Sequence, residues 1–352
     1  MSTLLVGCFT DDSGAGGLHL FETNGATLSP VTEAALASPA WLVAPSGGSQ
    51  GSSVVAVGHT SSSPVTHLTL GPDSVTLGAS RATSGSSGCH GEVSPDGSAI
   101  AVAHYDSGSV AIVPVEDEGW GDATVVRLSG HSGADPDRQE APHAHQTVWL
   151  DDEHLLVCDL GADAVRVLRW LDGHLSPIGT ITTTPGFGPR HLVLRRVPTS
   201  HGEQVQIAVA GELDGTLACF RHHGNAGTDW ARGWERVSQV SGTLVGGSQP
   251  SALRAVDEHT LVVANRSINT LALLEWHDSG QLVLADEFDC GGDHPRDVVV
   301  HEGAIWVANQ NSGDLCCFTR TDADGEPCGW RLASRTAVTS ASGGGPASML
   351  FL

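Results

Sequence analysis

Lysine is absent from this 352-residue sequence, and all 17 of its basic residues are arginine. Charged residues make up only 16% of the chain, which argues against long helices with charged, solvent-exposed faces. Because 40 acidic residues oppose those arginines, the formal net charge is −23. A field this negative disfavours binding to DNA, RNA or an anionic membrane surface. An anionic small molecule would need a local cluster of arginines to overcome it.

Long apolar runs are also missing. No stretch of 18 apolar residues occurs, so we expect no membrane-spanning helix. The first ten residues, MSTLLVGCFT, contain no basic region and only a brief apolar run, so we expect no secretory signal and a cytoplasmic location. The eight cysteines form no C-x-x-C pair, and Cys158 and Cys219 lie within apolar runs. This pattern predicts buried thiols in a reducing compartment, not a disulfide framework.

Glycine, by contrast, is abundant at 44 residues, and the chain repeats a pattern of short strands. In 88–115, GCHGEVSPDGSAIAVAHYDSGSVAIVPV, a first strand follows a small-residue anchor, the turn SPDG leads to a second strand, and DSGS leads to a third. Similar anchors occur near residues 39, 142, 189, 250, 295 and 346. A spacing of about 50 residues is that of one four-stranded blade. The sequence therefore predicts an all-β, seven-bladed β-propeller with antiparallel blades.

The seventh unit is split between the two ends of the chain. PASMLFL (346–352) supplies its first strand, and TLLVGCFT and GLHLFE near the N-terminus supply the partners. Closing the last blade with strands from both termini would remove the open sheet edges of the ring. No convincing apolar period of 3.6 residues occurs over ten or more residues. We therefore predict a single propeller domain over 1–352, in which 116–141 and 221–249 are surface loops.

Three blocks of the sequence carry a family resemblance. They are GADPDRQEAPHAHQTVWLDDEHLLVCDLGADAVRVLRW (133–170), PGFGPRHL (185–192) and VANQNSGDL (307–315). With them the chain resembles, over essentially its whole length, the lactonase family of seven-bladed propellers. That family includes propeller-type 6-phosphogluconolactonases and fungal 3-carboxy-muconate lactonising enzymes. The resemblance implies the propeller fold and a lactone-related reaction, but it does not select the lactone.

Repeat symmetry predicts where the chemistry lies without reference to a family. Equivalent residues of the seven units lie on one ring around the central channel, and each second strand ends at the face where the first strand begins. The position at the start of the first strand carries Ala40, Cys89, His145, Arg190, Ser251, Arg296 and Ala347. The position at the end of the second strand carries Phe9, Thr60, Tyr105, Leu160, Glu212, Arg266 and Gln310. We expect His145, Arg190, Glu212 and Arg266, from consecutive units, to converge at one channel mouth as the catalytic set. The resemblance implies the same four positions, through the muconate-lactonising members.

Other residues of this mouth are candidates for substrate binding. They are His143, His191, Tyr105, Arg296 and Gln310. Structural alternatives exist: His143 can orient its loop, Arg190 can pair with Glu140 or Glu212, and Arg296 can pair with Asp293 or Asp297. We expect Arg138 and Glu140, in the segment DRQEAP, to hold a loop over the channel.

Histidines near the channel raise the question of a metal site. His59, His104, His143, His145 and His191 would form a histidine-rich rim, yet no H-x-x-x-H helix and no Cys/His metal spacing occurs. Two or three guanidiniums beside the site would also repel a cation. We therefore expect neither a metal nor any other cofactor.

Lactone hydrolysis requires a base that activates water, a positive group for the tetrahedral oxyanion and a partner for the substrate's own charge. His145 can be the base at neutral pH, and Glu212 can orient it or be the base itself. Arg190 and Arg266 can bind a carboxylate or phosphate and stabilise negative charge. We expect a small anionic lactone as substrate, 6-phosphogluconolactone first, which would place a monomer or weak homodimer in the pentose phosphate pathway.

Two other functions remain open. The same residues could run a muconate-type cycloisomerisation, in which a carboxylate adds to a double bond and His or Glu delivers the proton. The chain could instead be a non-enzymatic scaffold for protein partners, with Trp120, Trp230, Trp234 and Trp330 in loop or strand-edge regions leaving room for a partner surface. A covalent nucleophile is not expected, because no serine is predicted on the strand-to-helix turn that forms a nucleophile elbow, and Cys89 is the one cysteine at a ring position.

Overall fold

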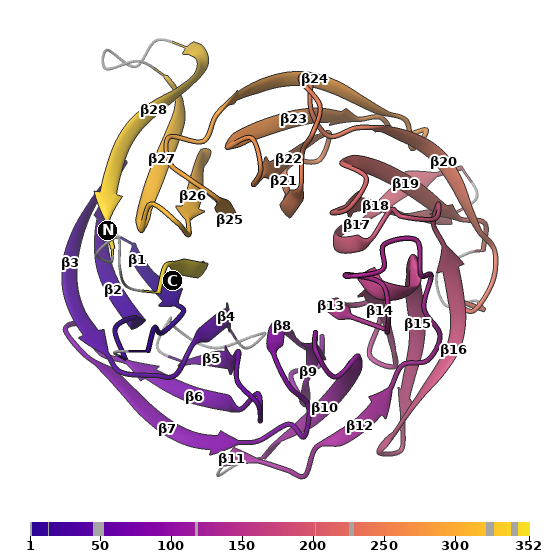
Figure 1. The fold of residues 1–352 in the computed structure, drawn as a ribbon, viewed down its shortest axis with the longest axis horizontal. Helices are drawn as coiled ribbons and strands as arrows, with labels where there is room; N and C mark the ends of the chain where they lie inside the picture. Colours follow the sequence, from indigo (N-terminus) through magenta and orange to yellow (C-terminus); the bar gives the residue numbers. More distant parts are fainter. Residues whose placement is uncertain are drawn as a thin grey trace.

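Seven antiparallel sheets stand side by side in a ring around a central channel (Figure 1). The structure, a computed structural model, describes residues 2–12, 14–44, 53–116, 119–200, 202–224, 229–321, 327–338 and 344–352. Within these ranges the one helix is a three-residue 3-10 turn, η1 (Leu160–Ala162). No helix of the described chain is long and apolar enough to cross a lipid bilayer. The predicted seven-bladed propeller is confirmed.

We number the blades from the one that begins at Pro39, and give each from the channel outward. Blade 1 contains β4 (Pro39–Val43), β5 (Ser53–Gly58), β6 (Val65–Leu70) and β7 (Val75–Arg81). Blade 2 contains β8 (Gly88–Val93), β9 (Ala99–His104) and β10 (Ser109–Glu116), with β11 (Gly119–Trp120) and β12 (Thr124–Arg127) both paired to β10. Blade 3 contains β13 (Ala144–Trp149), β14 (His154–Asp159), β15 (Ala164–Leu171) and β16 (His174–Thr182).

The remaining four blades complete the ring. Blade 4 contains β17 (Pro189–Thr199), β18 (Gly202–Gly211), β19 (Thr216–His222) and β20 (Trp234–Ser241). Blade 5 contains β21 (Pro250–Asp257), β22 (Thr260–Asn265), β23 (Thr270–Trp276) and β24 (Leu282–Asp289). Blade 6 contains β25 (Pro295–His301), β26 (Ala304–Asn309), β27 (Asp314–Thr321) and β28 (Pro327–Ala337). Blade 7 contains β29 (Pro346–Phe351), β1 (Thr3–Cys8), β2 (Gly17–Asn24) and β3 (Thr27–Ala34).

Blade 7 is closed as the split repeat predicts. Its innermost strand β29 pairs antiparallel with β1, with Leu4 opposite Phe351 and Val6 opposite Met349. In Figure 1 these two strands lie next to each other, although they come from opposite ends of the colour scale. The ladder supplies the hydrogen-bond partners that an open ring would leave exposed on β1.

The prediction that 116–141 and 221–249 are surface loops is wrong in part. The first stretch contains β11 and β12, and the second contains β20, which are the outer strands of blades 2 and 4. Both β12 and β20 consist of partly or fully exposed residues. An outer strand buries little apolar surface, so its sequence lacks the apolar pattern by which the inner strands are recognised.

The hydrophobic core is divided into seven clusters, each between two neighbouring blades. This packing contradicts, for Trp230, the expectation that four tryptophans leave room for a partner surface, and it gives the other three a packing role. Trp230 is 2% exposed in the cluster between blades 3 and 4, and Trp234 packs against the same cluster. Trp120 and Trp330 pack against two other clusters. These side chains stabilise the contacts between blades and do not support the scaffold interpretation.

Every inner strand has a β-bulge close to its start. In β17, Pro189 faces Gly211 and His191 faces Ala210, so Arg190 has no opposite residue. The same slip leaves Ala40, Cys89, His145, Arg296 and Ala347 unpaired, and in β21 it spans Ser251 and Ala252. A bulge turns a side chain out of the regular alternation of the strand. These are the ring positions that repeat symmetry had identified.

Candidate active site

The candidate residues gather at the end of the channel where the inner strands begin, which we call the site mouth. In each blade the residue at the end of the second strand donates its backbone N–H to the carbonyl oxygen two residues before the bulge. Glu212 N donates to Gly188 O at 2.9 Å, and Arg266 N donates to Gln249 O at 3.1 Å. This repeated hydrogen bond brings the two ring positions of a blade together.

The same hydrogen bond corrects one assignment of the repeat. In blade 1 the donor is His59, whose N–H reaches Ser38 O at 2.8 Å. The residue equivalent to Tyr105 and Glu212 is therefore His59 and not Thr60. The sequence repeat places this position one residue too late in blade 1, because the turn that follows β5 differs in length from those of the other blades.

Glu212 lies at the centre of the site mouth among three guanidiniums. Arg138 Nη2 donates to Oε1 at 2.6 Å, and Arg190 Nε and Arg266 Nη2 each lie 2.9 Å from Oε2. Glu212 is 1% exposed. Burial alone would raise the pKa of Glu212, but the charges of Arg266 and Arg190 outweigh it and hold that pKa well below its ordinary value. Glu212 is an anion at neutral pH that fixes the three arginines.

Several donors at the site mouth lack a partner. Arg190 Nε and Nη1 and Arg266 Nε are buried without a hydrogen-bond acceptor in the described chain, although Arg190 Nε lies within ion-pair distance of Glu212. An arginine carries five N–H donors, and leaving buried donors unpaired costs free energy. A ligand with several acceptor oxygens would supply the missing partners.

Arg296 has no acidic partner among the described residues. Its Nη1 donates to Gln310 Oε1 at 3.0 Å, and its Cζ lies 4.6 Å from the centre of the Phe9 ring. The alternative that Arg296 pairs with Asp297 is wrong, because Asp297 binds Arg254 at 2.8 Å. Burial and the charge of Arg266 lower the pKa of Arg296 to about 10, so it remains a cation.

His145 is buried next to this cluster. Its Nδ1 has no hydrogen-bond partner, and its ring lies 5.7 Å from Tyr105 and from His191, measured between centres. Burial, followed by the charge of Arg190, lowers the pKa of His145 well below its ordinary value. The imidazole is therefore neutral at pH 7 and free to accept a proton, but in the empty site it is a weak base.

The loop before β13 covers this end of the channel. Gln139 anchors the loop, since its Nε2 donates to Leu160 O at 2.8 Å and to Asp163 Oδ1 at 2.7 Å. Arg138 instead enters the site, where it donates to the Tyr105 hydroxyl at 3.0 Å as well as to Glu212. The prediction that Arg138 holds the loop is therefore wrong. Gln139 anchors the loop, and Arg138 lies in the site.

His143 and His191 do not lie where a substrate contact is most direct. His143 stacks on Tyr105, donates through Nδ1 to Tyr105 O at 2.9 Å and lies 3.1 Å from Glu140 through Nε2, which favours the alternative that it orients its loop. His191 follows the bulge of β17 and lies one layer further along the channel, with its ring near those of Trp41 and His90. The structure brings the other seven candidates together at the site mouth.

His294 was missed by the sequence analysis, although the repeat contains a signal for it. It stands two residues before the bulge of β25, the position that His143 occupies in blade 3. Burial and then Arg266 and Arg296 lower the pKa of His294 to about 4. This neutral imidazole lies close to Arg266 and Arg296, whose charges also act on His145.

Cys89 occupies the bulge of β8, and its surroundings exclude a thiolate nucleophile. Its thiol lies 3.4 Å from Ala144 O and 3.3 Å from His145 O. Burial raises the pKa of Cys89 to about 12, so the thiol remains protonated at neutral pH. No group of three or more His, Cys, Asp or Glu side chains in the described parts of the chain could hold a metal ion.

Comparison with known proteins adds a family to this geometry. The sequence profile described as "Lactonase, 7-bladed beta-propeller" matches residues 3–334. The chain is 30% identical over 247 residues to 6-phosphogluconolactonase of Bacillus subtilis (strain 168), which covers 68% of each protein.

Solved structures show the same architecture. The Pseudomonas aeruginosa periplasmic gluconolactonase superposes with a TM-score of 0.83 at 25% identity, covering 100% of this chain and 99% of that one. A protein from Lactobacillus plantarum superposes with a TM-score of 0.82 at 24% identity, covering 100% of both chains, which supports the fold alone.

Proposed function

The chain belongs to the lactonase family of seven-bladed β-propellers, and we propose that it hydrolyses a sugar lactone at the site mouth, with 6-phosphogluconolactone as the substrate. The observation that carries the proposal is a local excess of positive charge. Four arginines, at 138, 190, 266 and 296, lie around the carboxylate of Glu212, which forms ion pairs with the first three, in a protein of net charge −23. A phosphate monoester, with a charge of about −1.5 to −2 and three acceptor oxygens, matches that excess.

The two ends of the site mouth have different roles: one binds the phosphate group and the other binds the lactone ring. Arg266 and Arg296, with neutral His294 beside them, bind the phosphate group. The lactone ring then lies toward His145 and Tyr105. Arg190, between the two ends, points its unpaired Nη1 toward the carbonyl oxygen that becomes negative when water attacks.

His145 accepts the proton of the attacking water. Bound phosphate offsets the positive charge of Arg190 and so raises the pKa of His145, which makes the imidazole a stronger base in the complex than in the empty site. Glu212 lies close enough to stabilise the imidazolium. Glu212 itself is a poor base, because three guanidiniums hold it as an anion. The proton then moves to the ring oxygen that leaves as the lactone opens.

A pH-indicator assay tests this proposal with 6-phosphogluconolactone, gluconolactone and muconolactone as substrates. We expect Arg190→Ala to lower turnover on the phosphorylated lactone about a hundredfold, since one oxyanion donor contributes roughly 3–4 kcal/mol. We expect His145→Ala to lower it too, with both variants folded by circular dichroism. Unchanged kinetics in Arg190→Ala would remove its role, and no acid release from any lactone would remove the proposal.

A second readout separates the alternative reaction, because opening muconolactone to a muconate releases a proton just as hydrolysis does. Ultraviolet absorbance of the conjugated diene of a muconate, formed from muconolactone or lost to it, would favour the cycloisomerase, which needs the same anion binding and proton transfer. We also propose a cytoplasmic location and action on a small molecule by a monomer or weak homodimer. Seven of the eight cysteines are buried and form no disulfide, which supports a reducing compartment.

A further inference from the structure

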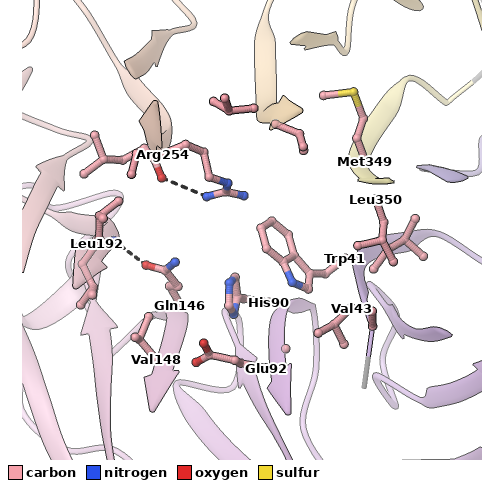
Figure 2. Close-up of a pocket in the computed structure, with 18 of the residues that line it drawn as sticks. Trp41, Val43, His90, Glu92, Gln146, Val148, Leu192, Arg254, Met349 and Leu350 are labelled. Carbon is pink, nitrogen blue, oxygen red and sulfur yellow. Dashed lines mark hydrogen bonds between the residues drawn. The ribbon is translucent and has the colours of Figure 1, made fainter. Parts of the chain in front are cut away.

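A cavity opens at the end of the channel opposite the site mouth. Its volume is about 720 Å³, within the range of small-molecule pockets. All seven inner strands line it with their later residues, from Trp41–Val43 of β4 to Met349–Phe351 of β29. Figure 2 shows Arg254, His90 and Trp41 extending toward its centre. We call it the distal cavity.

A layer of side chains stands between the distal cavity and the active site. Trp41 packs on His90 with ring centres 4.2 Å apart, and His191 lies within 6.0 Å of both. Arg254 lies over Trp41, with its Cζ 5.2 Å from the ring centre. The two ends of the channel are therefore chemically separate sites.

Arg254 and Glu92 line the distal cavity, and only Arg254 has an oppositely charged partner among the described residues. Arg254 is neutralised by Asp297, with Nη2 and Oδ1 2.8 Å apart. Glu92 forms no ion pair with any described residue. Among these residues its carboxylate accepts one hydrogen bond, from the backbone N–H of Trp149 to Oε2 at 2.8 Å. Burial raises the pKa of Glu92 to about 7. Glu92 is thus the acid of this cavity that lacks a cation.

The rest of the wall is largely apolar. Val43, Val148, Val299 and Leu350 line the cavity from four different blades. In Figure 2 the side chains of Val43, Val148 and Leu350 surround the same opening as Glu92. A ligand that fits this wall has an apolar body and one group that pairs with a carboxylate.

We propose that the distal cavity binds a small amine with an apolar body, its ammonium group on Glu92 Oε1 and its body against the valine and leucine wall. The field of a chain with net charge −23 draws a cation toward this mouth, whereas the arginines repel one from the other mouth. The inference does not depend on the proposed lactonase reaction.

The first test compares benzylamine with benzyl alcohol, which has the same ring and no charge. Both are titrated into the purified protein at pH 8 by calorimetry. We expect benzylamine to bind about tenfold more tightly or better, as a charge-assisted hydrogen bond permits. Equal binding of the two, or no binding of benzylamine, would overturn the proposal.

The second test uses Glu92→Gln, with Glu22→Gln, an exposed acid on β2, as the matched control. Glu92→Gln should remove the preference for the amine, and Glu22→Gln should retain it. Lactonase activity should be the same in both variants and the wild type, because Glu92 is outside the site mouth. A Glu92→Gln protein that binds benzylamine as tightly as the wild type would contradict the assignment.

The pH dependence of the wild type tests the proposal without any substitution. Other titratable groups lining the cavity are His90 on β8, Arg254 on β21 and His301 on β25; the neighbouring strands β4 and β13 add none. Since an ammonium group binds ionised Glu92 best, benzylamine affinity should rise between pH 6 and pH 8, while that of benzyl alcohol stays constant. A flat profile for the amine would count against Glu92.

Discussion

Arg296 differs from the other arginines of the site mouth, because Glu212 binds three of them and leaves Arg296 without an acid. If it holds the phosphate, Arg296→Gln should raise KM for 6-phosphogluconolactone about tenfold, consistent with losing one charge-assisted contact. KM for gluconolactone and kcat for either lactone should change little. Steady-state kinetics on both substrates measure this difference in KM. An equal rise in both KM values would mean that Arg296 does not bind the phosphate.

Several residues of the site could be identified from sequence, whereas their partners could not. Repeat spacing locates His145, Arg190 and Arg296 because each occupies the bulge that starts an inner strand. Spacing contains no information on side chains that arrive from loops, so the contact of Arg138 with Glu212 was not predicted. The role of His143 was left open for the same reason.

His104 provides a pH-dependent contribution to stability. It is fully buried between Thr83 Oγ1, at 2.6 Å, and Ser109 Oγ, at 3.1 Å. Burial lowers its pKa to about 4, so below about pH 6.5 the unfolded chain binds a proton that the folded chain resists. This contribution is complete above pH 6.5 and is lost as the pH falls toward 4.

The variant His104→Gln isolates this effect. Between pH 7 and pH 4 the wild type should lose about 3 kcal/mol more in free energy of unfolding than the variant, from a pKa difference of roughly 2.5 units. Urea unfolding at a series of pH values measures both slopes. Parallel profiles for the two proteins would show that His104 titrates alike in the folded and unfolded chains.

At the scale of strands, Asp297 connects three blades. Its Oδ1 binds Arg254 of β21 at 2.8 Å, and its Oδ2 accepts the N–H of Met349 in β29 at 3.0 Å. Replacing it with Asn leaves the Arg254 charge unpaired in the channel. We expect Asp297→Asn to lower the free energy of unfolding by about 3 kcal/mol, as for other broken buried ion pairs.

Chemical denaturation checks this value, with Glu153→Gln as the control. Glu153 pairs with Arg169 on the half-exposed surface of blade 3, where an ion pair contributes about 1 kcal/mol or less. If both substitutions have the same small effect, Asp297 does not hold the blades together.

Inner and second strands could be predicted from sequence, whereas outer strands could not, for one physical reason. The strands near the channel are buried on both faces, and their apolar runs, such as LLVC in β14, stand out. An outer strand such as β20 has one row of neighbours and an exposed face, so WERVSQVS is not distinguishable from a loop. Trp230 was misassigned because its burial comes from a neighbouring blade.

At the scale of the whole molecule, the bulk charge and the site charge act in opposite directions on an anionic substrate. The net charge of −23 repels the lactone phosphate at long range, whereas the buried arginines attract it at short range. Salt screens the long-range field more strongly, since the Debye length falls from about 30 Å at 0.01 M to about 8 Å at 0.15 M. We therefore expect kcat/KM for 6-phosphogluconolactone to rise a few-fold over this range.

Initial rates at low substrate concentration in sodium chloride measure this dependence. Gluconolactone, which carries no charge, serves as the control and should show no trend. A steady fall of kcat/KM with salt for the phosphorylated lactone would mean that the local arginines dominate at every distance.

The pairing of β1 with β29 has a consequence for synthesis on the ribosome. β1 can pair with β2 as soon as both are made, yet its partner on the other edge, β29, begins only at Pro346, so the nascent chain exposes one edge of β1 while blades 1 to 6 are synthesised. Blades 3 to 6, which carry most of the active-site residues, can form in order while the arc is still incomplete. The free edge of β1 is therefore protected from misassociation in the cell only when β29 pairs with it, after the blades that carry the site residues have been made.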